Sequence, residues 1–211
     1  MIKAFKDLNK KEINIFRKLN TPKKIQDFLE KLPINFEEKG DTLMSPRCVL
    51  RERKAHCIEG AIFAAAVLRF HGKKPILLDL ITASYDEDHV VALFKKNGLW
   101  GAISKTNHAV LRYREPVYRN VRELAMSYFH EYFVNDGEKT MRGYSEPFNL
   151  SRFDKDAWLT SEDDLWHIAE ELHDSRHHKI LTKSMLSGLR YADPIEREAG
   201  KLTHWEKNSG K

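Results

Sequence analysis

Long apolar stretches are scarce in this chain of 211 residues. The longest, from Ile58 to Leu68, is too short to cross a bilayer, because a spanning helix needs about 20 apolar residues. The basic start of the chain, Met1 to Lys6, is not followed by an apolar run or a small-residue cleavage site. We therefore expect a cytoplasmic protein with no membrane partner.

Cysteine is scarce as well, since the chain contains only Cys48 and Cys57. A reducing cytoplasm disfavours a disulfide between them. The residues that separate them contain no CxxC or zinc-ligand spacing. We expect two free thiols with separate roles, and we expect neither a metal nor a cofactor.

A strong excess of one charge is also absent. The net charge is +5, and the acids and bases that make up 32% of the chain are interspersed. A nucleic-acid-binding protein usually carries a basic stripe, and short basic clusters such as Arg51 to Lys54 do not form one. A hydrophobic share of 41% supports a packed core. We expect a globular protein without a nucleic-acid partner.

Helical patterns occupy the first part of the chain. Thr21 and Pro22 form a typical helix start, and apolar residues then recur at helical spacing as far as Leu32. Residues 40–46 are typical of a turn-rich loop. A helix is expected from Cys57 to about Phe70, and its many small residues predict close packing against a sheet.

Three strands are expected next, at 75–81, 89–94 and 99–103. Asn97 and Gly98 give the hairpin signal between the second and the third. A helix followed by consecutive short strands is typical of the α+β class with an antiparallel sheet.

Helices are expected again after Tyr118, and from Ser161 to about His173, where a serine cap precedes acidic residues. From Pro194 onward the chain is polar, and we expect a partly mobile tail. We expect one main domain over residues 1–160, with its core at about 45–135. A C-terminal helix and the tail would then occupy 161–211.

Cys57 stands at the start of the expected small-residue helix. The free amides and the macrodipole of a helix N-terminus stabilise a thiolate and lower its pKa. The alternative is an inert core cysteine, because free cysteine is often buried. Cys48 has no such helix start, and we expect it to be structural.

His89 opens the second expected strand, directly after the acidic loop 86–88. At this junction its imidazole can face a helix N-terminus. A thiol needs a base within hydrogen-bond reach to act as a nucleophile near neutral pH. We therefore predict a Cys57–His89 dyad.

The segments around this dyad resemble the transglutaminase-like superfamily. Residues 55–61 (Ala-His-Cys-Ile-Glu-Gly-Ala) resemble its nucleophile helix. Residues 89–93 (His-Val-Val-Ala-Leu) resemble its histidine strand, and 98–103 (Gly-Leu-Trp-Gly-Ala-Ile) resemble the next one. The resemblance covers about residues 45–110 and implies a core of the cysteine-proteinase type.

One position departs from the family pattern. The family usually places an aspartate a few residues after the tryptophan of the third strand, where it orients the histidine. Ser104 occupies that position here, and its hydroxyl carries no full charge. Asn107 is the alternative, because asparagine orients the histidine in papain-like enzymes. Strand register favours Ser104, and we retain both as candidate catalytic residues.

Two further residues are candidates for substrate binding. Trp100 belongs to the third strand of the resemblance, and Arg112 follows the sheet. An arginine there suits an acidic or carboxylate group.

Two histidine patterns are weaker. His130 and Glu131 begin like the zinc motif HExxH, but Val134 fills the position of its second histidine. Glu170, His173 and His177 have a spacing that can bind a metal on one helix face. A solvated face is the favoured interpretation.

Two functions follow as expectations. The first is an enzyme that acts on a peptide, a protein or a small amide through a Cys–His acyl-enzyme, with hydrolysis favoured over acyl transfer. The alternative is a protein-binding module of the same fold with little or no activity, which the serine at position 104 favours.

Overall fold

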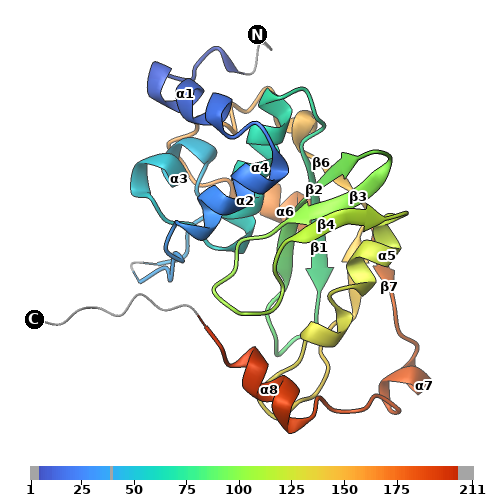
Figure 1. Ribbon diagram of the computed structural model, residues 1–211. Helices are drawn as coiled ribbons and strands as arrows, with labels where there is room; N and C mark the ends of the chain where they lie inside the picture. The colour runs from blue at the N-terminus through green and yellow to red at the C-terminus, as the bar shows by residue number, and fades with distance from the viewer. Residues whose placement is uncertain (1–4, 39, 204–211) are drawn as a thin grey trace, which may run out of the picture.

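The computed structural model describes residues 5–38 and 40–203. A seven-stranded sheet lies at the centre of the fold (Figure 1). The strands are β1 (Ile76–Ile81), β2 (His89–Lys96), β3 (Leu99–Ile103), β4 (Arg114–Tyr118), β5 (Gly143–Ser145), β6 (Phe148–Asn149) and β7 (His177–Lys179). Their order is β4-β3-β2-β1-β5-β7, and β6 also pairs with β1. All of these pairings are antiparallel.

Helices pack on both faces of this sheet. They are α1 (Lys10–Lys18), α2 (Pro22–Glu30), α3 (Pro46–Glu52), α4 (Cys57–Phe70), α5 (Val121–Met126), α6 (Trp166–His173), α7 (Lys183–Leu186) and α8 (Pro194–Gly200), with 3₁₀ turns η2 (Phe129–Glu131) and η3 (Leu150–Phe153). The predicted α+β class with an antiparallel sheet is confirmed. Within the described ranges, no helix has the length and apolar character needed to cross a membrane.

The central strand β2 separates two apolar cores. Val90, Ala92 and Phe94 pack in the core that contains α4 and the N-terminal helices. Val91 and Leu93 point to the opposite face, where the core contains α5. Because neighbouring strand residues face opposite sides of a sheet, a strand covered on both faces is continuously apolar. The α6 helix packs in the same core as α4.

The helix α4 begins at Cys57 and ends at Phe70, as the sequence predicts. Its small residues permit a close approach at one point in particular. A Cβ atom added to Gly60 would lie 2.5 Å from the Cβ of Lys105. The segment that follows β3 therefore lies directly against the first turns of α4, and it carries Ser104 with it.

The expectation of a loop over residues 40–46 holds only as far as Ser45. This serine caps α3, since its Oγ accepts a hydrogen bond from the Cys48 N–H at 3.2 Å, and Pro46 is the first helical residue. Cys48 thus lies in the first turn of a helix. The expectation that it has no helix start is wrong.

The helix predicted from Ser161 begins later, at Trp166. The preceding residues bind the segment before α3 instead: Asp164 Oδ1 accepts from the Leu43 N–H at 2.8 Å, and the Leu165 N–H donates to the Leu43 carbonyl at 2.9 Å. These contacts are distant in sequence, and they take precedence over the local capping signal.

A helix replaces the first part of the tail expected from Pro194. The α8 helix is capped by Asp193, and the Glu196 side chain returns a hydrogen bond to the Asp193 N–H. The strand-like segment after it is held by the Ala109 N–H, which donates to the Leu202 carbonyl at 2.8 Å. Residues 204–211 of the expected tail lie outside the described residues.

Replacing Gly60 tests the close approach of α4 to the segment after β3. Gly60→Ala should lower the free energy of unfolding by about 1–3 kcal/mol, although alanine favours helices, because the new methyl group collides with Lys105. Urea unfolding measures the change. Gly188→Ala is the matched control, since its nearest neighbour would be 3.8 Å away. Equal stability of Gly60→Ala and the wild type would contradict the packing described.

Candidate active site

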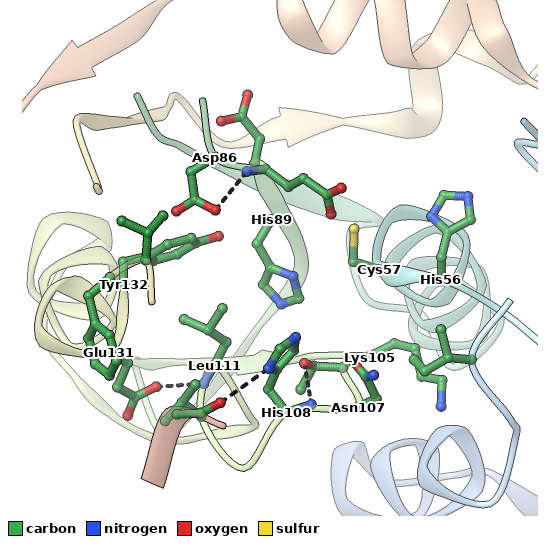
Figure 2. A pocket seen from close by; sticks show the side chains of 18 of the residues that line it. His56, Cys57, Asp86, His89, Lys105, Asn107, His108, Leu111, Glu131 and Tyr132 are labelled. Carbon is green, nitrogen blue, oxygen red and sulfur yellow. Dashed lines mark hydrogen bonds between the residues drawn. The ribbon is translucent and has the colours of Figure 1, made fainter. Parts of the chain in front are cut away.

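A cleft of about 750 Å³ opens where the first turn of α4 faces the start of β2. It is lined by residues 34–37, 56–57, 85–89, 105–108, 110–111 and 131–135, together with Arg197, Gly200 and Lys201. Figure 2 shows Cys57 between His56 and His89. The fold therefore brings one thiol and two imidazoles into a single cleft.

The Cys57 thiol is strongly acidic in this setting. Burial raises its pKa, but hydrogen bonds with the His56 and His89 side chains and the charges of both rings outweigh that effect. The resulting pKa of Cys57 is about 5, against an ordinary value of 9.0. Cys57 is also the first residue of α4, so its own N–H has no acceptor within the helix. Near neutral pH the side chain is a thiolate.

The hydroxyl of Ser104 fixes the tautomer of His89. Ser104 Oγ donates to the Leu111 carbonyl at 2.6 Å, which uses the single hydroxyl proton. The bond of 2.8 Å between His89 Nε2 and Ser104 Oγ must then be donated by the ring. His89 therefore carries its proton on Nε2, and Nδ1 is the nitrogen that can exchange a proton with the thiol.

The Leu111 carbonyl accepts this hydrogen bond, and Leu111 has an unusual backbone conformation. Its φ angle is +59°, a region that bulky residues rarely occupy. The Leu111 N–H donates to Glu131 Oε2 at 2.7 Å (Figure 2), and the same oxygen lies 2.6 Å from Arg114 Nη2. Glu131, itself paired with Arg114, thus helps to hold the Leu111 backbone where its carbonyl can accept from Ser104.

The backbone of Ser104 is held from the opposite side by Gln26 of α2. The Ser104 N–H donates to Gln26 Oε1 at 3.0 Å, and Gln26 Nε2 donates to the Ser104 carbonyl at 2.8 Å. Both residues are buried. The Gln26 side-chain amide thus bonds to the Ser104 N–H and carbonyl, as the backbone of a neighbouring strand would do. Nothing in the sequence pattern indicates this contact.

His56 is a second ionisable neighbour of the thiol that the sequence reasoning missed. Its Nε2 lies 3.0 Å from the Thr42 carbonyl, 3.4 Å from Glu59 Oε1 and 3.6 Å from Glu37 Oε1. Burial lowers the pKa of His56, but the bond to Cys57, the charges of Glu59 and Cys57 and the Thr42 carbonyl raise it to about 9. The ring is therefore an imidazolium at neutral pH.

A signal for His56 was present in the sequence. Glu59 stands three residues after it, which is the spacing of a capping box. In the structure Glu59 Oε2 accepts from the His56 N–H at 2.9 Å.

A buried carboxylate lies behind the cleft on β1. Asp79 Oδ2 is 3.2 Å from His177 Nε2, and within the described part of the chain Oδ1 has no hydrogen-bond partner. Burial, with the negative charge of Asp88, raises the pKa of Asp79 to about 6, although His177 opposes the shift. Asp79 is not among the site residues predicted from the sequence.

The remaining predicted site residues divide between the cleft and the outer surface. Asn107 lines the cleft, but within the described residues His89 bonds to Ser104 and not to Asn107. Trp100 and Arg112 do not line the cleft. Trp100 lies at the far end of β3 under Lys95, and Arg112 pairs with Glu30 at 3.3 Å. Trp100 and Arg112 are close to the site in sequence but do not line the cleft in the structure.

The possible metal trio is not assembled. The α6 helix ends at His173, and His177 belongs to β7, so they do not share a helix face. Among the residues that the structure describes, no group of three or more His, Cys, Asp or Glu side chains could hold a metal ion.

Comparison with known protein families finds no family model that matches this chain, and a search of curated proteins finds no match in sequence. Function therefore has to be argued from the geometry of the cleft.

Removing the Ser104 hydroxyl tests the tautomer assignment. Ser104→Ala should leave His89 Nε2–H without its acceptor, so that both neutral tautomers become populated. The NMR shifts of the ring nitrogens distinguish the two forms. Ser187→Ala, at an exposed position, is the control and should retain the wild-type shifts. A single Nε2–H tautomer in Ser104→Ala would show that another group fixes the ring.

Asp79 should make the stability depend on pH. Its folded pKa of about 6 lies above the unfolded value of about 3.9, so its contribution is present below that lower value and is lost as the pH rises through 6. Asp79→Asn removes this loss. Relative to the wild type, the variant should gain more stability at pH 8 than at pH 4, as measured by urea unfolding. The exposed Asp156→Asn is the control, and a difference that is independent of pH would contradict the raised pKa.

Proposed function

We propose that this protein is a thiol hydrolase resembling the transglutaminase-like superfamily, and that it cleaves an amide or ester bond through an acyl-enzyme on Cys57. The observation that carries the proposal is the Cys57 thiol at the start of α4, in a cleft that two imidazoles line and next to one whose tautomer Ser104 fixes. This setting lowers the pKa of the thiol to about 5. Inert buried cysteines do not have this environment.

The reaction would proceed in two steps. His89 Nδ1 takes the proton of the Cys57 thiol, and the resulting thiolate attacks the carbonyl carbon. The bond to the amine or alcohol breaks as His89 gives that proton to the leaving group. Water then attacks the thioester, His89 Nδ1 takes its proton, and the acid leaves as the Cys57 thiolate is restored. The Cys57 N–H, free at the start of α4, is a donor for the oxyanion in both steps.

The substrate class is an amide or ester in a peptide, a protein or a small molecule. We favour water over an amine as the acyl acceptor. A reducing compartment such as the cytoplasm is proposed as the place of action, because both cysteines are free and the mechanism requires a reduced Cys57.

The pH profile of alkylation tests this function. Iodoacetamide should modify Cys57 at a rate that rises through about pH 5, because the thiolate is the reactive form and appears above its pKa. An ordinary thiol would show its midpoint at about 8.5. Mass spectrometry locates the adduct. Cys57→Ser should lose the reaction, and Cys48→Ser should keep it.

An acyl-enzyme should also be detectable. With p-nitrophenyl acetate, we expect release of p-nitrophenol and an acetyl thioester on Cys57 that intact-mass measurement reveals. Neither signal should occur in Cys57→Ser. An ordinary thiol profile together with no thioester would overturn the proposal and favour the binding module.

A further inference from the structure

Two imidazoles flank one thiol, and their surroundings differ. We propose that His56 is the fixed positive charge that keeps Cys57 a thiolate, while His89 is the group that carries protons during the reaction. This division of labour rests on the proposed function, in which Cys57 is the nucleophile.

The contacts of His56 favour a permanent charge. Its Nε2 faces the Thr42 carbonyl and the carboxylates of Glu59 and Glu37, at 3.0, 3.4 and 3.6 Å. A carbonyl oxygen only accepts hydrogen bonds, so Nε2 carries a proton. Two carboxylates within about 4 Å favour a second proton on the ring. The ring is thus held charged by the Thr42 carbonyl and the carboxylates of Glu59 and Glu37.

The contacts of His89 are different in kind. Its Nε2 donates to the neutral Ser104 hydroxyl, which in turn donates to the Leu111 carbonyl. No carboxylate is hydrogen-bonded to this ring within the described residues. Such a ring can exchange a proton at Nδ1 while Nε2–H stays bonded to Ser104, which is what general acid–base catalysis requires.

Other ionisable groups near Cys57 do not supply the charge that stabilises its thiolate. Burial raises the pKa of Asp79 and of Tyr132, and a negative charge on Cys57 adds to the rise in both. Tyr132 is therefore neutral near neutral pH, whereas an ionised Asp79 disfavours the thiolate. Lys105 also lines the cleft, but its Nζ donates to the Leu32 carbonyl and burial lowers its pKa to about 8. Lys105 is thus directed at Leu32, and the groups that lower the pKa of the Cys57 thiol are the two imidazoles.

The mechanism gives each ring a separate step. When water cleaves the thioester, the bond between sulfur and carbon breaks and its electron pair returns to Sγ. His56 stabilises that charge without giving up a proton, and His89 takes the proton of the attacking water. Loss of His56 should therefore affect the thiolate, whereas loss of His89 should affect deacylation.

The experiment compares His56→Gln and His89→Gln in the full chain, with His130→Gln, at an exposed position outside the cleft, as the control. The midpoint of the alkylation profile with iodoacetamide should rise by about two pH units in His56→Gln and by less than about one in His89→Gln. With p-nitrophenyl acetate, His89→Gln should accumulate the acetyl thioester that the wild type hydrolyses.

A second variant guards against a folding defect in His56→Gln. Glu37→Gln removes one charge beside the His56 ring but keeps an oxygen to accept the Thr42 N–H, which donates to Glu37 Oε1 at 2.7 Å. It should shift the midpoint in the same direction as His56→Gln, by a smaller amount. Thermal unfolding confirms that each variant is folded.

The outcomes separate the two ideas. A wild-type midpoint near 5 with a larger shift in His89→Gln than in His56→Gln, or with equal shifts, overturns the division of labour and leaves the thiol mechanism intact. A wild-type midpoint like that of an ordinary thiol overturns both. A larger shift in His56→Gln, with thioester accumulation in His89→Gln alone, supports the assignment.

Discussion

The buried carboxylate of Glu59 is the constraint on which the site depends. Its side chain has no exposed surface, and a charge this deep is stable only when its oxygens are hydrogen-bonded. Glu59 accepts from the Thr42 hydroxyl at 2.8 Å and from the N–H groups of Met44 and His56 at 2.9 Å. These bonds order the segment before α3 and fix where α4 begins. The carboxylate that caps the helix also faces the imidazole beside Cys57.

The Ser104 hydroxyl orients His89, and three separate segments of the chain set its position. Gln26 of α2 bonds to the Ser104 backbone, and Gly60 of α4 allows the segment after β3 to approach that helix. The Leu111 carbonyl accepts the hydrogen bond of the Ser104 hydroxyl. A serine orients an imidazole only if its own proton is committed elsewhere. Because that condition is met, Ser104 determines the tautomer of His89 without contributing a negative charge. The positive charge beside the thiolate then has to be sustained by other carboxylates, and Glu59 and Glu37 lie in the right place.

The parts that sequence reasoning predicted are those with local signals. The helix α4 was predictable from its run of apolar and small residues, and β1 and β2 from short apolar runs. The Asn-Gly turn signal then predicted β3. The late start of α6 could not be predicted, because it depends on hydrogen bonds to Leu43, far away in the chain. Gln26 and Leu111 have no local signal at all. His56 did have one, in its spacing to Glu59, while Trp100 shows that closeness in sequence to a site does not place a side chain in it.

Comparison of the two cysteines shows what makes a reactive thiol here. Both lie in the first turn of a helix, so the macrodipole favours a thiolate in each. Cys48 is buried outside the cleft, and its Sγ lies 3.5 Å from the Ser161 carbonyl and accepts from Arg51 Nη2 at 3.4 Å. Cys57 lacks such an acceptor in the described residues; it has two imidazole donors and an open cleft. The position at a helix start is therefore shared by a cysteine that does not line the cleft. The distinguishing features are the flanking histidines and the carboxylates that keep one of them charged.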